Sequence, residues 1–542
     1  MTFTSLTLES LQTTSSLILP FFLLYPEIHY RFRFFPFSRY FKKEPEIIAD
    51  IPHRIERGRR MPVFVLVKDA HLYPTSILSV RTIITKGANS DELIFQVQEE
   101  IRQHWWWKKW DIAVNESWIG HTVQLRIVVE YRTAGVTHTV EADNIIGTTK
   151  APFDVYVSGD HWPQPQGWFN GDLHVHSDYT EDAIEYGAPL PMLRAASEAL
   201  GLNFIAVTDH SYDLDNKKED YNQSDPTLAQ WRTFIESVKQ MNEESSSKVL
   251  LLAGEELSCM NIADENIHAL ILNSDHFFYG SGDGGKNPLN TSSEHTVSGM
   301  ARLLNKEALI MAAHPLEKPS PMERAFLQRG IWRLEDFYNR SAEVLQILNG
   351  SNDTAFKQGL GLWVHLLLSG RRVYIVAGND AHGNFNRNRQ VRIPFWTIED
   401  ISHHKQLGWA RTVLYLGEKK PNTQNTIDAI REGCAIISTG PYVVFNVLNE
   451  AGFSSRIGQN AKGRRFRVAW EASSTQEFGA LETISVFQGV IGESHEKVST
   501  MTVESWCDQG EFHTTADAPS YIRLSVTTKS QNFCYTNPIW LE

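Results

Sequence analysis

Short apolar runs recur through the middle of the chain, and a residue of metal-ligand type or a polar turn residue follows nearly all of them. The runs cover Asp172–Val175, Phe204–Thr208, Val249–Ala253, Ile267–Leu272, Ala308–Ala313, Val344–Leu348 and Val373–Ala377. Helical spacing of apolar residues appears in between, over Leu190–Leu200, Thr227–Glu243, His295–Asn305 and Thr354–Leu368. This α/β alternation predicts parallel strands with right-handed crossovers, in a closed or distorted (β/α)7 barrel. An open doubly wound sheet is the alternative.

On both sides of this region the pattern changes to the alternation typical of β-strands. The sequence predicts a β-rich N-terminal domain over residues 62–160, the barrel over 168–441 and a C-terminal β-sandwich-like domain over 442–542, with Pro163–Gly167 as a linker. Residues 1–61 are predicted to be a poorly ordered extension, and Met61 is a second possible start. Leu17–Tyr25 is too short for a transmembrane segment, and no basic residue precedes it as in a signal peptide.

Composition narrows the class of protein. The chain has 542 residues, 42% of them hydrophobic, and a formal net charge of −13. This charge argues against a general nucleic-acid coat, but it leaves open a nuclease whose metals neutralise phosphate locally. The four widely spaced cysteines favour a reduced, cytoplasmic protein, while secretion or a periplasmic location stays open. A Cys507–Cys534 disulfide is an alternative, and the sequence indicates no oligomeric state.

The residues at the ends of the apolar runs predict a metal site. His174 and His176 are two residues apart on one strand, so their side chains project from the same face, and Asp380 and His382 repeat the spacing. Further candidates are Asp209, His210, Glu256, His268, His314 and Asn349. Strand ends in a parallel barrel meet at one mouth. Imidazole and carboxylate ligands suit Zn, Mn or Fe, and burying so many of them without metal would be costly.

The motifs GDLHVHSDYTED, LNFIAVTDHS, LLLAGEEL, NIHALIL, MAAHP and VAGNDAHG together resemble the PHP (polymerase and histidinol phosphatase) superfamily of metal-dependent phosphoesterases. The similarity spans Gly171–Gly383, and the flanking β regions are most similar to the CehA/McbA branch, named after a carbamate hydrolase. The resemblance implies a distorted seven-stranded barrel with two or three divalent metal ions, Zn, Mn or Fe.

Residue roles follow from the same resemblance. The implied metal ligands are His174, His176, Glu181, His210, Glu256, His268, His314, Asp380 and His382. Glu181 stands where the family has an aspartate, so its neighbour Asp182 is an equal alternative. Glu256 could bridge two metals, with Glu255 pointing to the other face. Asp209 is expected to orient His210 or share a proton with it, which makes it the candidate catalytic side chain besides the metals.

These observations predict a hydrolase that uses a metal-bound hydroxide, with no Ser or Cys nucleophile. A phosphoesterase acting on a small phosphate ester or a nucleic-acid end, in the manner of a 5'-3' exonuclease, is the first hypothesis. Arg387 and Arg389 are candidates to bind the phosphate and Asn349 to contact substrate, although all three could be ordinary loop residues. The alternatives are a carbamate or carboxylic ester hydrolase with the same site, and a metal-stabilised binding module without catalysis.

Overall fold

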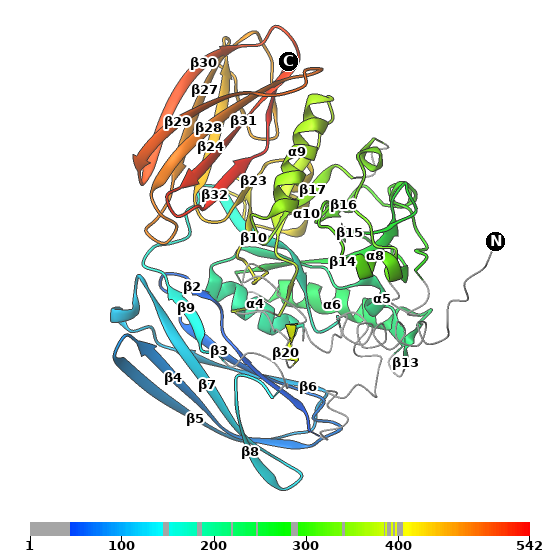
Figure 1. Ribbon diagram of the computed structural model, residues 1–542, viewed down its shortest axis with the longest axis vertical. Coiled ribbons are helices and arrows are strands. Elements are labelled where there is room, and N and C mark those ends of the chain that lie inside the picture. The colour runs from blue at the N-terminus through cyan, green and yellow to red at the C-terminus, as the bar shows by residue number, and fades with distance from the viewer. Residues whose placement is uncertain are drawn as a thin grey trace, which may run out of the picture.

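The computed structural model describes residues 44–144, 151–180, 187–217, 220–244, 248–282, 291–338, 342–383, 385–386, 392–393, 396–397 and 405–542. Over these residues the chain is mostly β and contains several sheets. Figure 1 shows β-sheets at the lower end, from the N-terminal part of the chain, a central body of strands and helices, and β-sheets at the upper end that carry the C-terminus. The candidate residues that the structure describes lie in the central body.

The N-terminal region consists of two sheets that enclose one apolar cluster. Its strands are β1 (Glu46–Asp50), β2 (Arg54–Ile55), β3 (Met61–Lys68), β4 (Thr75–Lys86), β5 (Asn89–Ile101), β6 (Trp105–Ile112), β7 (His121–Thr133), β8 (Val136–Glu141) and β9 (Phe153–Val157). The sheet β1-β3-β6 faces the sheet β2-β9-β7-β4-β5. The prediction of a poorly ordered segment through residue 61 was wrong for β1 and β2, because the buried β1 pairs along its whole length with β3.

Strand β3 joins this region to the central body because both of its faces are buried. Val63, Val65 and Val67 point into the N-terminal cluster, whereas Phe64 and Leu66 pack into a second cluster with residues of the central body. Alternate strand residues point to opposite faces, so a strand that reads as continuously apolar is expected between two cores.

The central body is built on a sheet that carries the predicted apolar runs in order. Its strands are β10 (Trp168–His176), β11 (Phe204–Val207), β14 (Leu250–Met260), β15 (Asn266–Leu272), β16 (Leu309–Ala313), β17 (Val344–Asn349), β18 (Tyr374–Gly378) and β19 (Ala381–His382). The sheet order runs from β10 through β11, β14, β15, β16 and β17 to β18. The short β19 follows β18 and pairs in parallel with β10, so the first and last strands of this stretch are neighbours.

One strand of this sheet departs from the predicted parallel arrangement. Strand β15 is antiparallel to both β14 and β16, whereas the other neighbours from β10 to β18 are parallel. The segment Asn261–Glu265 between β14 and β15 is a tight turn, too short for the dozen or more residues of a parallel crossover. The prediction of parallel pairing throughout was therefore wrong at this position.

Three helices of the central body lie where the apolar spacing predicted them: α4 (Leu190–Leu200), α6 (Ala229–Glu243) and α9 (Thr354–Leu368). The body also contains α10 (Thr423–Arg431) and the short α5 (Ser211–Leu214) and α8 (Pro321–Leu327), which were not predicted, and α7 (Val297–Met300). Helix α4 ends at Gly201, whose φ of 77° suits glycine, and Asp353 caps the first turn of α9 through the backbone amide of Phe356. The helix predicted over 295–305 shortens to the four residues of α7.

The C-terminal strands form two facing sheets, as the alternation predicted. Strands β24 (Tyr442–Asn449), β25 (Ser454–Arg456), β27 (Arg465–Ser473) and β30 (Cys507–Thr515) form one sheet. The other includes β28 (Leu481–Val490), β29 (Lys497–Ser505), β31 (Ser520–Thr528) and β32 (Phe533–Thr536). It is continuous with the central sheet, because β32 pairs with β23 (Ala435–Ser438), β23 with β22 (Arg411–Tyr415) and β22 with β10.

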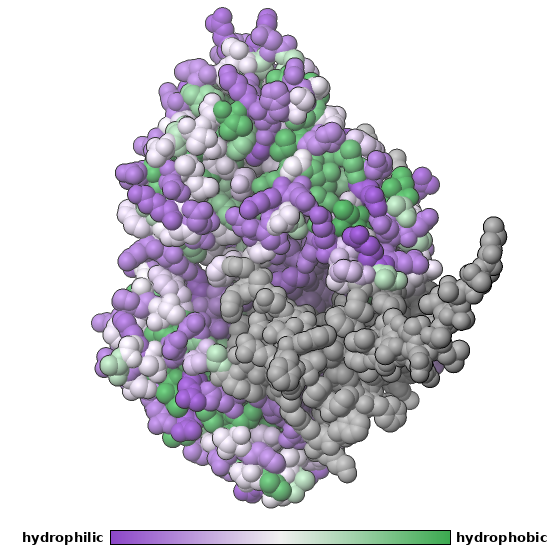
Figure 2. All heavy atoms as spheres, in the orientation of Figure 1, coloured by the Kyte–Doolittle hydropathy of each residue, from purple (hydrophilic) through white to green (hydrophobic). Residues whose placement is uncertain are grey.

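Three further features of the described residues bear on the sequence predictions. All four cysteines are free, so the Cys507–Cys534 disulfide does not form. No helix of the described part of the chain has the length and apolar character of a membrane span. Among the residues that Figure 2 colours, hydrophilic ones predominate, with apolar residues between them.

Candidate metal centre

One buried carboxylate lies at the centre of the predicted constellation. Glu256 on β14 is 1% exposed, and its two oxygens lie near imidazole nitrogens from five different positions. The distances from Oε2 are 3.3 Å to His174 Nε2, 3.2 Å to His176 Nε2 and 3.3 Å to His210 Nδ1, and those from Oε1 are 2.6 Å to His268 Nδ1 and 3.2 Å to His314 Nε2. Residues separated by up to 140 positions in the sequence thus meet at one point.

A second carboxylate lies beside the first two histidines. Asp380 Oδ1 is 3.4 Å from His174 Nε2 and 3.2 Å from His176 Nε2, and the two imidazole nitrogens are 3.1 Å apart. His382 lies two residues further on β19, where it pairs in register with His176. The i, i+2 spacing at the end of β10 has therefore placed His174 and His176 on one side of the sheet. Asp380 lies between β18 and β19, so the turn there, and not strand alternation, brings it to this side.

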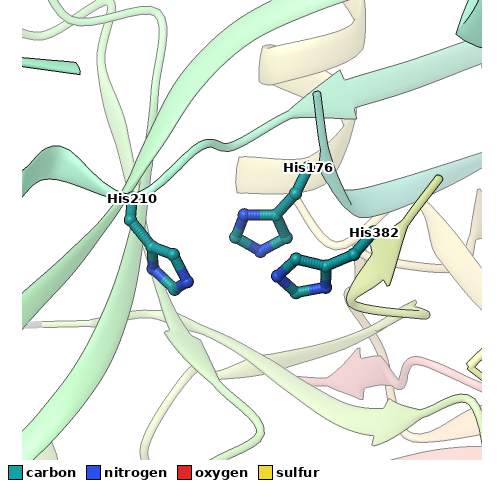
Figure 3. Close-up of side chains that lie close together, drawn as sticks. All are labelled: His176, His210 and His382. Carbon is teal, nitrogen blue, oxygen red and sulfur yellow. The ribbon is translucent and has the colours of Figure 1, made fainter. Parts of the chain in front are cut away.

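Three overlapping groups of side chains in this centre could each hold a metal ion. They are His176 with His210 and His382, His174 with His176, Glu256 and Asp380, and Glu256 with His268 and His314, and the ligand atoms of each group lie within 4.8 Å of one another. Figure 3 shows the first group, with the rings of His176, His210 and His382 gathered at one place from three separate segments. His176 and Glu256 each belong to two groups, which is the arrangement that bridging or neighbouring metals require.

His268 enters the centre because β15 is antiparallel. It is the second residue of β15 and pairs with Ser258, close to Glu256 on the neighbouring strand. His174, His176 and His382 lie at the ends of their strands and His210 and His314 just beyond theirs, whereas Glu256 lies inside β14, which continues to Met260, and His268 lies at the start of β15. Since β15 runs in the opposite direction, its start lies at the same edge of the sheet as the ends of its parallel neighbours.

Backbone conformation and close packing position the candidate ligands. His314, directly after β16, and Asp380, two residues after β18, have φ values of 27° and 54°, which non-glycine residues rarely adopt and which concentrate at functional sites. A Cβ on Gly378 would lie 2.6 Å from Cβ of His174, so only glycine lets β18 approach His174 this closely. The buried Asp172 accepts hydrogen bonds from the backbone amides of His174, Asn379 and Gly408.

The electrostatics keep both carboxylates ionised. Burial alone would raise the pKa of Glu256, but the surrounding imidazoles, His268 and His174 first, hold it well below its usual value. Burial opposes ionisation of Asp380 too, and Lys405 and His174 lower its pKa in the same way. Burial lowers the pKa of His176, yet its contacts with Asp380 and Glu256 raise it to about 10. The ionised carboxylates of Glu256 and Asp380 thus favour positive charge on the groups around them.

The residues present fit a metal cluster better than they fit one another. His210 Nδ1 is buried without a hydrogen bond, and five imidazoles cannot all donate well to one carboxylate. Two ligands bound at about 2.0–2.1 Å to one ion at tetrahedral or octahedral angles lie roughly 2.9–3.4 Å apart. The separations of 3.1–3.4 Å between the ligand atoms of His174, His176 and Asp380 fall in this range.

Asp209 has a different partner from the one expected. Its buried carboxylate accepts hydrogen bonds from the backbone amides and hydroxyls of Ser177 and Thr180, at 2.7–3.1 Å, and not from His210. The Thr180 hydroxyl lies 3.3 Å from His176 Nδ1. The interpretation of Asp209 as a partner of His210 was therefore wrong: it fixes the turn after β10 and so positions His176. Glu255 faces away from the cluster, as expected, and accepts a hydrogen bond from Ser211 Oγ.

Several polar residues around the centre were missed in the sequence. Gln346 Oε1 lies 2.9 Å from His174 Nδ1, and its amide donates to Asn349, a predicted substrate contact. Asn349 in turn donates to Glu317, and Lys405 Nζ lies 2.9 Å from Asp380 Oδ2 and 3.6 Å from Glu317 Oε1. Arg329 also contacts the ring of His268. Gln346 lies inside an apolar run, and the other missed residues do not directly follow one. No local pattern in the sequence therefore marked them as site residues.

Four candidates lie outside the described residues. They are Glu181, its alternative Asp182, Arg387 and Arg389. The remaining predicted site residues, Asn349 and Asp209 included, all lie at the centre or in its immediate supporting contacts.

Comparison with known proteins adds no assignment. No family model matches the chain, and no curated protein matches it. Among solved structures, it is similar to a calcium-binding mutant of Bacteroides uniformis β-glucuronidase 2, with 8% identity and a TM-score of 0.18 over 93% of this chain and 62% of that one. A putative β-galactosidase from Bacteroides fragilis gives 10% identity and a TM-score of 0.16 over 92% of this chain and 73% of that one. The chain spans about three fifths of the first two structures. Similarity at these TM-scores carries no argument about fold or function.

Proposed function

We propose that this protein is a metal-dependent hydrolase, and specifically a phosphoesterase with a two- or three-metal site on a distorted PHP-type barrel. The observation that carries the proposal is the position of Glu256, whose two oxygens lie 2.6–3.3 Å from the nitrogens of five histidines. Divalent ions bound there, Zn, Mn or Fe, would supply Lewis acidity and lower the pKa of a water molecule towards 7.

The residues of the chain itself divide into three tasks. His174, His176, His210, Glu256, His268, His314, Asp380 and His382 would hold the ions. Asp209, Asp172 and Gln346 position these ligands from behind. Two cationic side chains, Lys405 and Arg329, border the ligands on different sides and would attract and orient an anionic substrate.

The cations at the rim favour a phosphate ester over an uncharged ester. The Lys405 side chain, 29% exposed, carries its charge next to Asp380, so an entering phosphate oxygen can approach it. A carbamate or carboxylic ester would have no negative charge for Lys405 or Arg329 to neutralise in the ground state. Nucleic-acid ends are one source of such a phosphate, and small phosphomonoesters are another.

A substrate panel with the metal-loaded protein tests the proposal. The panel contains p-nitrophenyl phosphate, bis(p-nitrophenyl) phosphate, a 5'-labelled oligonucleotide, p-nitrophenyl acetate and an aryl carbamate, each with Zn, Mn and Fe. We expect turnover of a phosphate ester, abolished in the His174→Ala/His176→Ala variant. Lys405→Ala should lower kcat/KM for that ester by about 100-fold, the scale of losing one charge-stabilising donor.

Each other outcome contradicts a stated part of the proposal. Turnover of the acetate or the carbamate alone would assign the site to carboxylic or carbamic esters. Full metal loading without turnover of any member of the panel would indicate a metal-stabilised binding module. Unchanged turnover in His174→Ala/His176→Ala would place the activity elsewhere.

A further inference from the structure

A second group of metal-ligand side chains lies in the N-terminal region, away from the residues of the candidate metal centre. Asp69, His71 and His104 have ligand atoms that all lie within 4.8 Å of one another. His104 Nε2 is 2.9 Å from Asp69 Oδ1, and the rings of His71 and His104 are 4.8 Å apart in an edge arrangement. We propose that these three side chains bind a single divalent transition-metal ion, with Zn²⁺ as the probe.

The backbone holds the three residues together independently of their side chains. The β3–β6 ladder ends with the pair Lys68 and Trp105, so Asp69 and His104 are the next residues on the two strands. The Asp69 amide donates to the carbonyl of His104 at 2.7 Å, and the His71 amide donates to the carbonyl of Gln103 at 3.1 Å. The site is thus preformed at the end of a regular ladder rather than made by mobile side chains.

A strained turn brings His71 back against His104. Asp69 has a φ of 67°, and its carbonyl accepts hydrogen bonds from the amides of Leu72 and Tyr73. The left-handed conformation costs free energy for a residue with a side chain, although aspartate and asparagine tolerate it best. The turn reverses the chain within a few residues and places a second imidazole beside the Asp69–His104 pair.

The ligand set and its exposure match a site with open coordination positions. Two imidazoles and one carboxylate are a common ligand combination for first-row divalent metals. The Asp69 side chain is 10% exposed and that of His104 is 37% exposed, while His71 is exposed. Protein ligands would therefore cover one side of the ion and water the other. His104 is followed by Trp105, which packs against the cluster shared with the central body, so the ion would also tie the turn to that packing.

Zinc binding by the full chain tests the proposal without reference to catalysis. Zn²⁺ per chain is measured by elemental analysis after loading and exchange, and affinity by competition with a chromophoric chelator. We expect the His71→Ala/His104→Ala variant to bind one ion fewer than the wild type. The matched control is His121→Ala, which removes an exposed histidine of the same region that belongs to none of the ligand groups and should leave zinc binding unchanged.

Asp69→Asn separates the loss of a ligand from damage to the fold. Asparagine keeps the side-chain shape and tolerates the left-handed φ of this position, so the turn should persist. Loss of a residue that supports a metal site weakens metal binding by roughly 10–100-fold. We therefore expect Asp69→Asn to bind zinc at least tenfold more weakly than the wild type. Without metal, the variant and the wild type should unfold at the same temperature. Equal zinc content and affinity in the wild type, His71→Ala/His104→Ala and Asp69→Asn would overturn the proposal. A fall of the same size in His121→Ala would show adventitious binding to surface histidines and overturn it equally.

Discussion

His268 Nδ1 lies 2.6 Å from Oε1 of Glu256, across the antiparallel pair β15 and β14. The contact joins the start of one strand to the middle of the next. It shows that the reversed strand contributes to the same centre as its parallel neighbours. If a bound ion separates the two side chains, removing the carboxylate will affect metal binding more than any other single change.

Glu256→Gln should therefore lose metal. The amide keeps the size of the side chain but removes the negative charge on which five imidazoles converge, so we expect metal binding more than about 100-fold weaker, beyond the loss caused by a supporting residue. Elemental analysis of the purified variant measures the change. Glu255→Gln is the matched control, because Glu255 faces Ser211 and the Phe278 amide instead of the cluster and its replacement should leave the metal content intact. Equal metal content in both variants would contradict the central role of Glu256.

Metal removal should lower the stability of the fold. An ion that binds only the folded chain adds about 2.7 kcal/mol when its free concentration is 100 times its Kd. Exhaustive dialysis against a chelator should reduce the midpoint temperature of thermal unfolding, and re-addition of the ion should restore it. The His174→Ala/His176→Ala variant is the control, since its midpoint should respond much less. A chelator-independent midpoint in the wild type would argue that the cluster is stable without ions.

Gly378→Ala should disturb the centre through packing alone. The added methyl would lie 2.6 Å from Cβ of His174 and 2.9 Å from Nε2 of Gln346, so β18 or His174 must move. We expect a destabilisation of about 1–3 kcal/mol, typical of overpacked cores, together with a lower metal affinity. Gly361→Ala on α9 serves as the control because its methyl meets nothing within 4 Å and alanine favours helix. Denaturant unfolding and metal analysis of both variants distinguish a local clash from a general effect of Gly→Ala.

His53 should make stability depend on pH in mildly acidic solution. Burial lowers the pKa of this histidine from 6.5 to about 3, assisted by the cations of Arg411 and Arg54 and opposed by the hydrogen bond to the Phe385 carbonyl. Between pH 6.5 and 3 the unfolded chain binds the proton and the folded chain does not. The contribution of neutral His53 to the free energy of unfolding is therefore fully present above pH 6.5. It falls with decreasing pH, by at most about 1.4 kcal/mol per pH unit.

Denaturant unfolding of the wild type and of His53→Gln at pH 7.5, 6 and 5 measures this contribution. The free-energy difference between the two proteins should shrink as the pH falls. A difference that is the same at all three pH values would show that His53 keeps its ordinary pKa in the folded chain.

The sequence predicted the structure correctly where the position of a side chain depends only on the strand that carries it. The i, i+2 spacing of His174 and His176 placed both rings on one face, the apolar runs located the central strands except for the far end of β14, and the helical spacing located α4 and α9. The sequence prediction failed at β15, because the short turn before this strand makes it antiparallel to its neighbours. It also failed at β1, because the residues of this strand become ordered by pairing with β3, which is distant in the sequence. It also assigned Asp209 to its sequence neighbour His210, whereas the fold brings Ser177 and Thr180 to it.

The identity of the ligand-type residues and the shared face of His174 and His176 were thus determined by the sequence alone, because strand periodicity is a local property of the chain. The predicted strand end before Glu256 was wrong, since β14 continues to Met260. The choice of partner for each of them was decided by the tertiary structure. Glu256 meets five histidines from four segments, Lys405 reaches Asp380, and Asp69 meets His104 at the end of a ladder, because these distances depend on how distant strands pair and in which direction they run. No local pattern encodes that pairing.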